Sequence, residues 1–196
     1  MRIEDFYKFM KEREIIRLRK EDGEPYPWTT DPIFQTYKFT NVKRADDKTT
    51  RWFWKNVLEQ NADKPKEQLL FHCALFRYFG TTEFAEAYGG WLDSWLDDKE
   101  TVRSIAKKRL KNSQRVFTGA YVITNQGIKA PKQDVVIDQF LTPLWHKLPD
   151  LVQVAEKTHS WQAVALEMMK LKGFGGTGFM TKEVLQDALH TSVFER

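Results

Sequence analysis

The sequence predicts an all-α fold. Apolar residues recur near the helical period over most of the chain, as they do at Ile3, Phe6, Tyr7 and Met10. Glycine and proline stand at the ends of these periodic segments, where helices usually stop. The stretch VFTGAYVIT, residues 116–124, is β-branched and aromatic, but it has no obvious partner strand and is read as extended or helical.

Each helix can be placed from its periodicity and its flanking residues. The predicted helices cover residues 3–20, 49–61, 67–79, 82–88, 100–112, 134–148, 150–157 and 161–171, and a last one follows Gly178. The third of them is apolar nearly all round, so it should lie at the centre of the fold. An interruption is expected near Pro143. Residues 24–52 form a long unperiodic segment, and such segments in compact domains are often functional.

Composition narrows the class of protein. A chain of 196 residues with 41% hydrophobic and 30% charged residues predicts one globular domain over residues 1–196. One cysteine and four scattered histidines offer no spacing for a zinc or iron–sulfur site, and no cofactor motif is evident. No apolar run approaches the ~20 residues of a membrane span, so we expect a cytoplasmic protein without a membrane partner.

The glycines between Leu171 and Leu189, in LKGFGGTGFMTKEVLQDAL, predict a hairpin between two helices. A dinucleotide fingerprint would need a preceding strand, and a P-loop would need Lys and then Ser or Thr after Gly178. The pattern instead fits a helix-hairpin-helix element at about residues 160–190. In such an element the backbone N–H groups of the hairpin would bind DNA phosphates. The residues expected to do so are Gly173, Gly175, Gly176 and Thr177. The alternative is that the glycines only cap a helix and link it to the next.

The positive charge is concentrated in one segment. Residues 101–133 contain eight Lys and Arg residues and no acid, which is the pattern expected of a surface that binds a phosphate backbone. Lys107, Lys108 and Lys111 lie on the outward side of the predicted helix 100–112. A solvated helix face that binds nothing is the alternative.

A second polar set lies between Glu24 and Arg51. It combines carboxylates, cations and aromatic rings, a mixture suited to a site that stacks a base and handles a phosphate on it. Its members include Asp31, Asp46, Asp47, Lys43, Arg44, Trp28, Phe34, Tyr37 and Phe39. The alternative is a charged loop held by ion pairs.

The run from Glu12 to Trp52 contains Arg17, Gly23, PWTTDP at 27–32, Phe39, Asn41, Val42, Arg44, Asp47 and Thr50. With FTGAY at 117–121, GFG at 173–175, Glu183 and Asp187, this pattern resembles the α-glutamyl/putrescinyl thymine pyrophosphorylase family. The helical domain of phage 5-hydroxymethyluracil DNA kinases belongs to the same group. The resemblance implies a helical bundle similar to helix-hairpin-helix DNA glycosylases. Thr177 stands where lysine-type glycosylases place a catalytic Lys, which argues against a Schiff-base lyase.

The resemblance also implies an activity on phage DNA. An amine from an amino acid or polyamine would displace phosphate or pyrophosphate from a phosphorylated 5-hydroxymethyluracil in double-stranded DNA. Trp28, Phe39 and Asn41 would receive the base, and Arg44, with Arg17 or Arg51, would neutralise the leaving group. Asp31 or Asp47 would deprotonate the amine. A DNA glycosylase and a non-catalytic DNA-binding module remain alternatives, and the sequence leaves open the amine, the leaving group and the oligomeric state.

Overall fold

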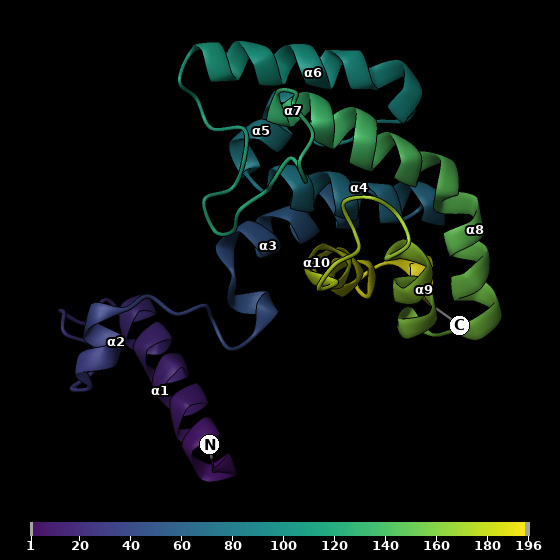
Figure 1. Ribbon diagram of the computed structural model, residues 1–196. Coiled ribbons are helices and arrows are strands. Elements are labelled where there is room, and N and C mark those ends of the chain that lie inside the picture. The colour runs from purple at the N-terminus through teal and green to yellow at the C-terminus, as the bar shows by residue number, and fades with distance from the viewer. Residues whose placement is uncertain (1, 195–196) are drawn as a thin grey trace. The chain divides into compact units, whose positions relative to one another are not determined.

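The computed structural model describes residues 2–194 and confirms the all-α prediction. Within this range every regular element is helical. Contacts along the chain divide it into two compact units, Met1–Arg51 and Trp52–Arg196, coloured from purple to blue and from blue to yellow in Figure 1. The single domain predicted over residues 1–196 stays a prediction.

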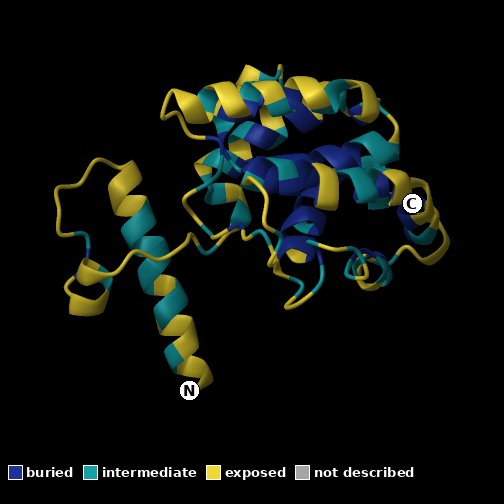
Figure 2. Cartoon of the chain, turned by 45° about the horizontal axis from the view of Figure 1, so that its top comes forward, coloured by how far each residue is buried: buried dark blue, intermediate teal, exposed yellow. Residues whose placement is uncertain are grey.

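The first unit is built on α1 (Ile3–Glu21), which agrees with the predicted helix 3–20. It also contains α2 (Pro32–Thr36) and the short 3-10 helix η1 (Arg44–Asp46). No residue of α1 is buried, as its yellow and teal ribbon shows in Figure 2. The apolar contacts come from Phe9, Phe34 and Phe39, whose ring centroids lie 4.9 to 5.4 Å apart. These rings hold α1 against α2 and the segment that follows it.

The second predicted helix, 49–61, is present with a change of winding. It begins as α3 (Lys48–Phe53), continues as the π-helix η2 (Trp54–Leu58) and ends as the 3-10 helix η3 (Glu59–Asn61). In the second unit, the Phe53 ring stacks on Phe76 with centroids 4.1 Å apart. This stacking fixes the start of the second unit on its central helix.

The centre of the second unit is α4 (Lys66–Phe79), as predicted from its apolar sequence. Every residue from Leu69 to Phe79 is buried, and the helix is dark blue in Figure 2. It ends at Gly80, whose φ of +66° is the left-handed conformation that glycine adopts without strain. Helices α8 and α10 pack against it.

The remaining helices surround α4 (Figure 1). They are α5 (Thr82–Ala87), α6 (Trp95–Lys111), α7 (Lys132–Val135), η4 (Val136–Leu141), α8 (Thr142–Thr158), α9 (Trp161–Met168), α10 (Phe179–Ala188) and η5 (Ser192–Phe194). Helix α6 starts earlier than the predicted Glu100 because Trp95 is fully buried and donates its indole N–H to Thr142 Oγ1 at 2.9 Å. Tertiary packing therefore extends the helix beyond its basic portion.

The predicted break between residues 148 and 150 is wrong. Helix α8 runs through Pro149 without interruption and carries a buried stripe that includes Leu144, Leu148, Leu151 and Ala155. An internal proline costs about 3 kcal/mol because it removes one backbone hydrogen bond. Burying several aliphatic side chains at about 1.5 to 3 kcal/mol each outweighs that cost.

Residues 116–124 are neither a strand nor a helix. The backbone N–H of Thr118 donates to Phe79 O at 2.6 Å, and the Tyr121 hydroxyl donates to the Arg77 carbonyl. Val116 and Ile123 are buried. Two polar groups of the segment therefore bind carbonyls in the last turn of α4, where the helix has no further N–H groups to donate to them, and no partner strand is needed.

Candidate functional site

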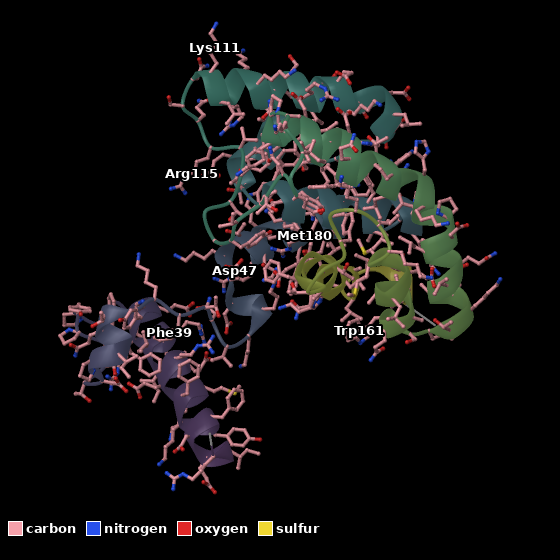
Figure 3. The ribbon with its side chains drawn as sticks, in the orientation of Figure 1. Phe39, Asp47, Lys111, Arg115, Trp161 and Met180 are labelled. Atoms are coloured by element: carbon pink, nitrogen blue, oxygen red, sulfur yellow. The ribbon has the colours of Figure 1, made fainter. Side chains whose placement is uncertain are left out.

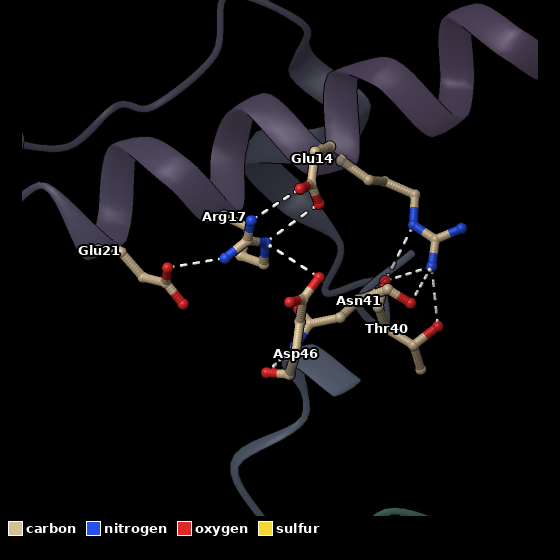
Figure 4. Close-up of polar contacts among 7 residues, drawn as sticks. Glu14, Arg17, Glu21, Thr40, Asn41 and Asp46 are labelled. Carbon is tan, nitrogen blue, oxygen red and sulfur yellow. Dashed lines mark hydrogen bonds and ion pairs between the residues drawn. The ribbon is translucent and has the colours of Figure 1, made fainter. Parts of the chain in front are cut away.

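Two arginines on one face of α1 hold the loop that follows α2. Arg13 and Arg17 are four residues apart and therefore neighbours on the helix surface. The Arg13 guanidinium donates to Thr40 O at 2.9 Å, to Thr40 Oγ1 at 2.9 Å and to Asn41 O at 3.1 Å (Figure 4). Because these bonds go to backbone as well as side-chain oxygens, they fix the course of the loop and not only one side chain.

Arg17 is surrounded by carboxylates. Its guanidinium lies 2.7 Å from Glu14, 2.7 Å from Glu21 and 3.3 Å from Asp46 (Figure 4). The hydrogen bond that Arg17 donates to Glu14 raises the Arg17 pKa above its ordinary value, and the bond to Glu21 and the charge of Asp46 raise it further. In this arrangement the charge of Arg17 is used to join α1 to η1.

This framework surrounds a pocket of about 1000 Å³ whose lining residues all belong to the first unit. Positive charge exceeds negative charge in the lining, and aromatic rings are frequent. The cations are Arg13, Arg17, Lys20, Lys38, Lys48 and Arg51; the carboxylates are Glu21, Asp46 and Asp47; the rings are Tyr26, Trp28, Phe34, Tyr37 and Phe39. Such a lining can stack a planar base and bind an anion attached to it.

The predicted base-binding residues Trp28, Phe39 and Asn41 all line this pocket. The Trp28 indole donates to Glu24 O at 2.7 Å, and Lys20 Nζ lies 4.5 Å from its ring centroid. Asn41 donates its side-chain amide to Asp46 O at 2.9 Å. These bonds fix both side chains, so the pocket is largely formed before any ligand binds. Their role in base binding stays a prediction.

The two predicted acid–base carboxylates are helix N-caps. Asp31 Oδ1 accepts the N–H of Ile33 at 2.8 Å, and Asp47 Oδ1 accepts the N–H of Thr50 at 2.7 Å. Asp47 lines the pocket, whereas Asp31 does not. The predicted phosphate ligand Arg44 is also absent from the lining, while Arg51 is present. Of the predicted catalytic set, the pocket therefore brings together Arg17 and Asp47.

Sequence reasoning did not single out several lining residues. Arg13, Lys20, Lys38, Lys48 and Tyr26 were not among the predicted site residues. The spacing of Arg13, Arg17 and Lys20 by four and three residues was a usable signal, because it places three cations on one helix face. The loop cations gave no such signal, since their direction depends on contacts across the loop.

The predicted hairpin joins α9 to α10 in the second unit. Gly173 has a φ of +93°, and a Cβ there would lie 2.4 Å from Tyr78 Oη and 2.6 Å from Phe140 Cγ. A Cβ on Gly175 would lie 2.7 Å from the Met169 carbonyl oxygen. These two glycines are thus required by close packing. Gly176 and Thr177 are exposed at the tip, where a phosphate could reach them.

The basic helix α6 forms ion pairs along one side, and its C-terminal end is exposed. Arg103 binds Asp134 at 2.6 Å and Asp138 at 2.7 Å, and the Asp138 hydrogen bond is the main reason that its pKa is raised. Lys107 lies 3.6 Å from Asp134. Lys108 and Lys111 are exposed, and Figure 3 shows Lys111 projecting from the end of the helix, with Arg115 beyond it. The exposed end is the part that could bind phosphates.

The second unit also contains a buried charge pair that sequence reasoning did not anticipate. The Arg77 guanidinium donates to both oxygens of Asp187, at 2.7 Å for Nη2 to Oδ1, and Trp54 Nε1 donates to Asp187 Oδ1 at 3.0 Å. The two charged side chains are 5% and 0% exposed. The pair links α4 to α10, the helix that follows the hairpin.

Among residues 2–194, no three His, Cys, Asp or Glu side chains lie close enough together to hold a metal ion. In the same range, no helix has the length and hydropathy needed to cross a membrane.

Comparison with known proteins confirms the relation to the helical domain of 5-hydroxymethyluracil DNA kinases, whereas membership of the pyrophosphorylase family stays a prediction. Residues 1–195 match the family described as 5-hmdU DNA kinase, helical domain. A protein of Bacillus phage SP10, named 5-hmdU DNA kinase, is 30% identical over 123 residues, which are 61% of this chain and 19% of the phage protein. The chain thus corresponds to about a fifth of that relative. No solved structure matches, so the likeness to helix-hairpin-helix DNA glycosylases stays a prediction.

Proposed function

The chain belongs to the family of the 5-hmdU DNA kinase helical domain, and from this premise we propose that it is an enzyme of thymine hypermodification in phage DNA. Its substrate is a phosphorylated or pyrophosphorylated 5-hydroxymethyluracil in double-stranded DNA. Its second substrate is an amine, either an amino acid or a polyamine. This is the reaction expected of the pyrophosphorylase family that the sequence resembles, and the pocket of the first unit is the observation that carries it.

The pocket offers the groups that this displacement needs. Five aromatic rings suit a pyrimidine ring, and the five cationic side chains other than Arg17 suit the phosphate that leaves. The amine nitrogen forms a bond to the exocyclic methylene carbon, and the bond from that carbon to the phosphate oxygen breaks. The phosphate departs with the electron pair, and the extra proton on nitrogen passes to a carboxylate.

Within the lining, Asp47 and Arg51 are the best placed of the candidate catalytic residues. Asp47 uses Oδ1 for the cap, which leaves Oδ2 to take the proton. Arg51 is exposed and lines the pocket, so its fixed charge can stabilise the leaving group. Arg17 would act mainly as a positioning residue, because three carboxylates already surround it. A direct role for Arg44 or Asp31 would require their side chains to reach the pocket.

The decisive experiment is mass spectrometry of nucleosides from DNA that contains phosphorylated or pyrophosphorylated 5-hydroxymethyluracil. The DNA is incubated with the protein and a panel of amines, and an amine-substituted thymine is the expected product. Unchanged nucleosides under every condition would overturn the proposal. A glycosylase would instead release free base and leave abasic sites, which alkali cleaves.

The double role of Asp47 allows a clean test of its chemistry. Asp47→Ser and Asp47→Asn both remove the carboxylate and keep a good N-cap, so the fold should be retained. We expect product formation to fall by about 100-fold or more, the range typical of lost general acid–base catalysis. Asp31→Asn is the matched control, because it changes a capping carboxylate outside the pocket. Equal activity of the Asp47 and Asp31 variants would exclude Asp47 as the base.

A non-catalytic DNA-binding module is the second candidate. It is favoured by the structural contacts of three predicted catalytic residues. Asp31 and Asp47 cap helices, and Arg17 forms ion pairs. In that case the protein would bind DNA through exposed cations and leave every nucleoside unchanged. Arg51→Gln would then alter DNA affinity no more than the loss of any exposed charge would.

A further inference from the structure

A second, smaller pocket lies beside the hairpin of the second unit. Its volume is about 140 Å³. One wall is the hairpin and the start of α10, and the other is the irregular segment that follows residue 120. The lining residues are Tyr78, Tyr121, Val122, Ile123, Thr124, Gln126, Phe140, Gly173, Gly175, Thr177, Phe179 and Met180.

Fixed aromatic side chains form the walls of this pocket. Tyr78 and Phe140 are buried, and the Tyr78 hydroxyl donates to Gly173 O at 2.6 Å. The rings of Tyr121 and Phe179 meet edge to face with centroids 5.2 Å apart. Since these side chains are held by packing and by a hydrogen bond, the pocket keeps its shape without a ligand.

The size of the pocket suits one six-membered ring. A protein cavity of about 150 Å³ is large enough to bind benzene. Among the residues that the structure describes, no Lys, Arg, Asp, Glu or His lines this pocket. Burial raises the pKa of Tyr78, so its hydroxyl also stays uncharged. A phosphate group would lose its hydration here without gaining a counter-charge, which is strongly unfavourable.

The rim of the pocket is polar. Thr124, Gln126 and Thr177 are exposed and carry two hydroxyls and a carboxamide. A carboxamide has both a donor and an acceptor, so it can pair with the N–H and C=O edge of a pyrimidine. Gln126 is held at a φ of +48° in a turn that the bond from Ile128 N to Asn125 O, 3.0 Å, closes. The side-chain carboxamide of Gln126 is therefore attached to a turn of defined conformation.

We infer that this pocket takes an uncharged pyrimidine base rotated out of DNA, and that it excludes the phosphorylated form. Aromatic walls, a ring-sized volume, a neutral lining and a polar rim together specify that ligand. The identification of the ring as a DNA base rests on the proposed function. The two pockets then differ in substrate: the charged pocket of the first unit takes the phosphorylated base, and the neutral pocket takes the base without phosphate.

The test is an NMR titration of the full-length chain with free 5-hydroxymethyluracil and with its phosphate ester. The free base should produce saturable shifts confined to the backbone amides of residues 121–126 and 173–180. The phosphate ester should bind there at least about tenfold more weakly, because of its desolvation cost. Shifts of equal size from both compounds, or shifts of the free base elsewhere only, would overturn the inference.

Two variants and one control localise the binding. Val122→Trp places a large ring at the rim from a residue that is 82% exposed, and should abolish binding without disturbing the core. Gln126→Gly removes the amide and suits the positive φ, so it should weaken binding without strain. Leu166→Trp, at a position on α9 that is 66% exposed and outside the pocket, is the matched control and should bind like the unchanged protein. Unaltered binding by both pocket variants would refute the site.

The outcome is separable from that of the proposed function. Products formed from phosphorylated DNA by a protein that shows no binding of free base in this pocket would overturn the inference alone. Base binding in the pocket without any product from DNA would overturn the transferase alone.

Discussion

Substitution of Asp187 should destabilise the second unit severely. Asp187 is fully buried in α10 and accepts hydrogen bonds from Arg77 on α4 and from Trp54. Asp187→Ala removes the carboxylate that the Arg77 guanidinium binds through two nitrogens, while that guanidinium stays 5% exposed. The variant also removes the acceptor of the Trp54 indole N–H. Both changes raise the free energy of the folded state.

The magnitude follows from these contacts. Breaking a buried ion pair by removing one partner costs about 3 to 5 kcal/mol, because the remaining desolvated charge loses a counter-charge that it binds directly. An unpaired indole N–H adds about 1 to 3 kcal/mol if water does not reach it. Domains of this size are stable by about 5 to 15 kcal/mol, so the variant should lose much of its stability. The double variant Arg77→Met/Asp187→Leu removes both charges and should cost less than Asp187→Ala alone.

Urea unfolding followed by circular dichroism measures these differences for the single and double variants. A double-mutant cycle then gives the coupling between the two side chains. If Asp187→Ala lowers the free energy of unfolding by less than about 1 kcal/mol, the buried pair is not a main link between α4 and α10. A double variant less stable than the single one would refute the assignment of the cost to the lost attraction between Asp187 and the buried Arg77 guanidinium. DNA binding should fall together with stability, because α10 supports the hairpin.

Three further outcomes are expected. The double variant Lys108→Glu/Lys111→Glu should weaken DNA binding. The slope of the logarithm of the binding constant against the logarithm of salt concentration should become shallower by about 0.9 for each phosphate that is no longer neutralised, as fluorescence anisotropy over a salt series would measure. An unchanged slope would show that the end of α6 does not bind phosphate. His72 donates from Nδ1 to Gln68 O and accepts the Leu92 N–H at Nε2, and burial lowers its pKa from 6.5 to about 4. The free energy of unfolding should therefore not depend on His72 above pH 6.5, the pKa of this side chain in the unfolded chain. It should fall by about 1 kcal/mol per pH unit as the pH drops from there towards the folded-state pKa of about 4. His72→Met should remove this slope in urea titrations. Gly175→Ala should destabilise the hairpin by about 1 to 3 kcal/mol because its Cβ would lie 2.7 Å from Met169 O, whereas a shift in melting temperature within error would contradict that steric conflict.

The helices could be predicted from sequence because their signals are local. Apolar period and terminal glycines located α1, α4 and α10 without knowledge of their packing. The start of α6 and the passage of α8 through Pro149 could not be predicted, since both depend on burial against other helices. Prediction from local sequence fails where tertiary packing stabilises a helix by more free energy than the local preferences of its residues oppose it.

The candidate site was predictable in composition but not in geometry. The segment from Glu24 to Arg51 does line a charged and aromatic pocket together with α1, yet Asp31 and Arg44 do not line it. A usable signal was present for Asp31, because Asp followed by Pro is a common helix start, with Asp as N-cap and Pro at the first helical position. Nothing local indicated that Arg13 would bind Thr40 across 27 residues and so set the shape of the pocket.

The two candidate pockets differ in the charge of their lining residues, and this difference predicts the order in which they would bind a base. A lining with six cations and three carboxylates should bind a phosphorylated base more tightly than the same base without phosphate, because its net charge is positive. A neutral ring-sized pocket has the opposite preference. If both bind the same nucleotide at different stages, the phosphorylated base occupies the first and a base without phosphate the second. Product release from the charged pocket should then depend on ionic strength, while binding in the neutral pocket should not. A salt-independent affinity of the charged pocket for phosphorylated nucleoside would contradict this division.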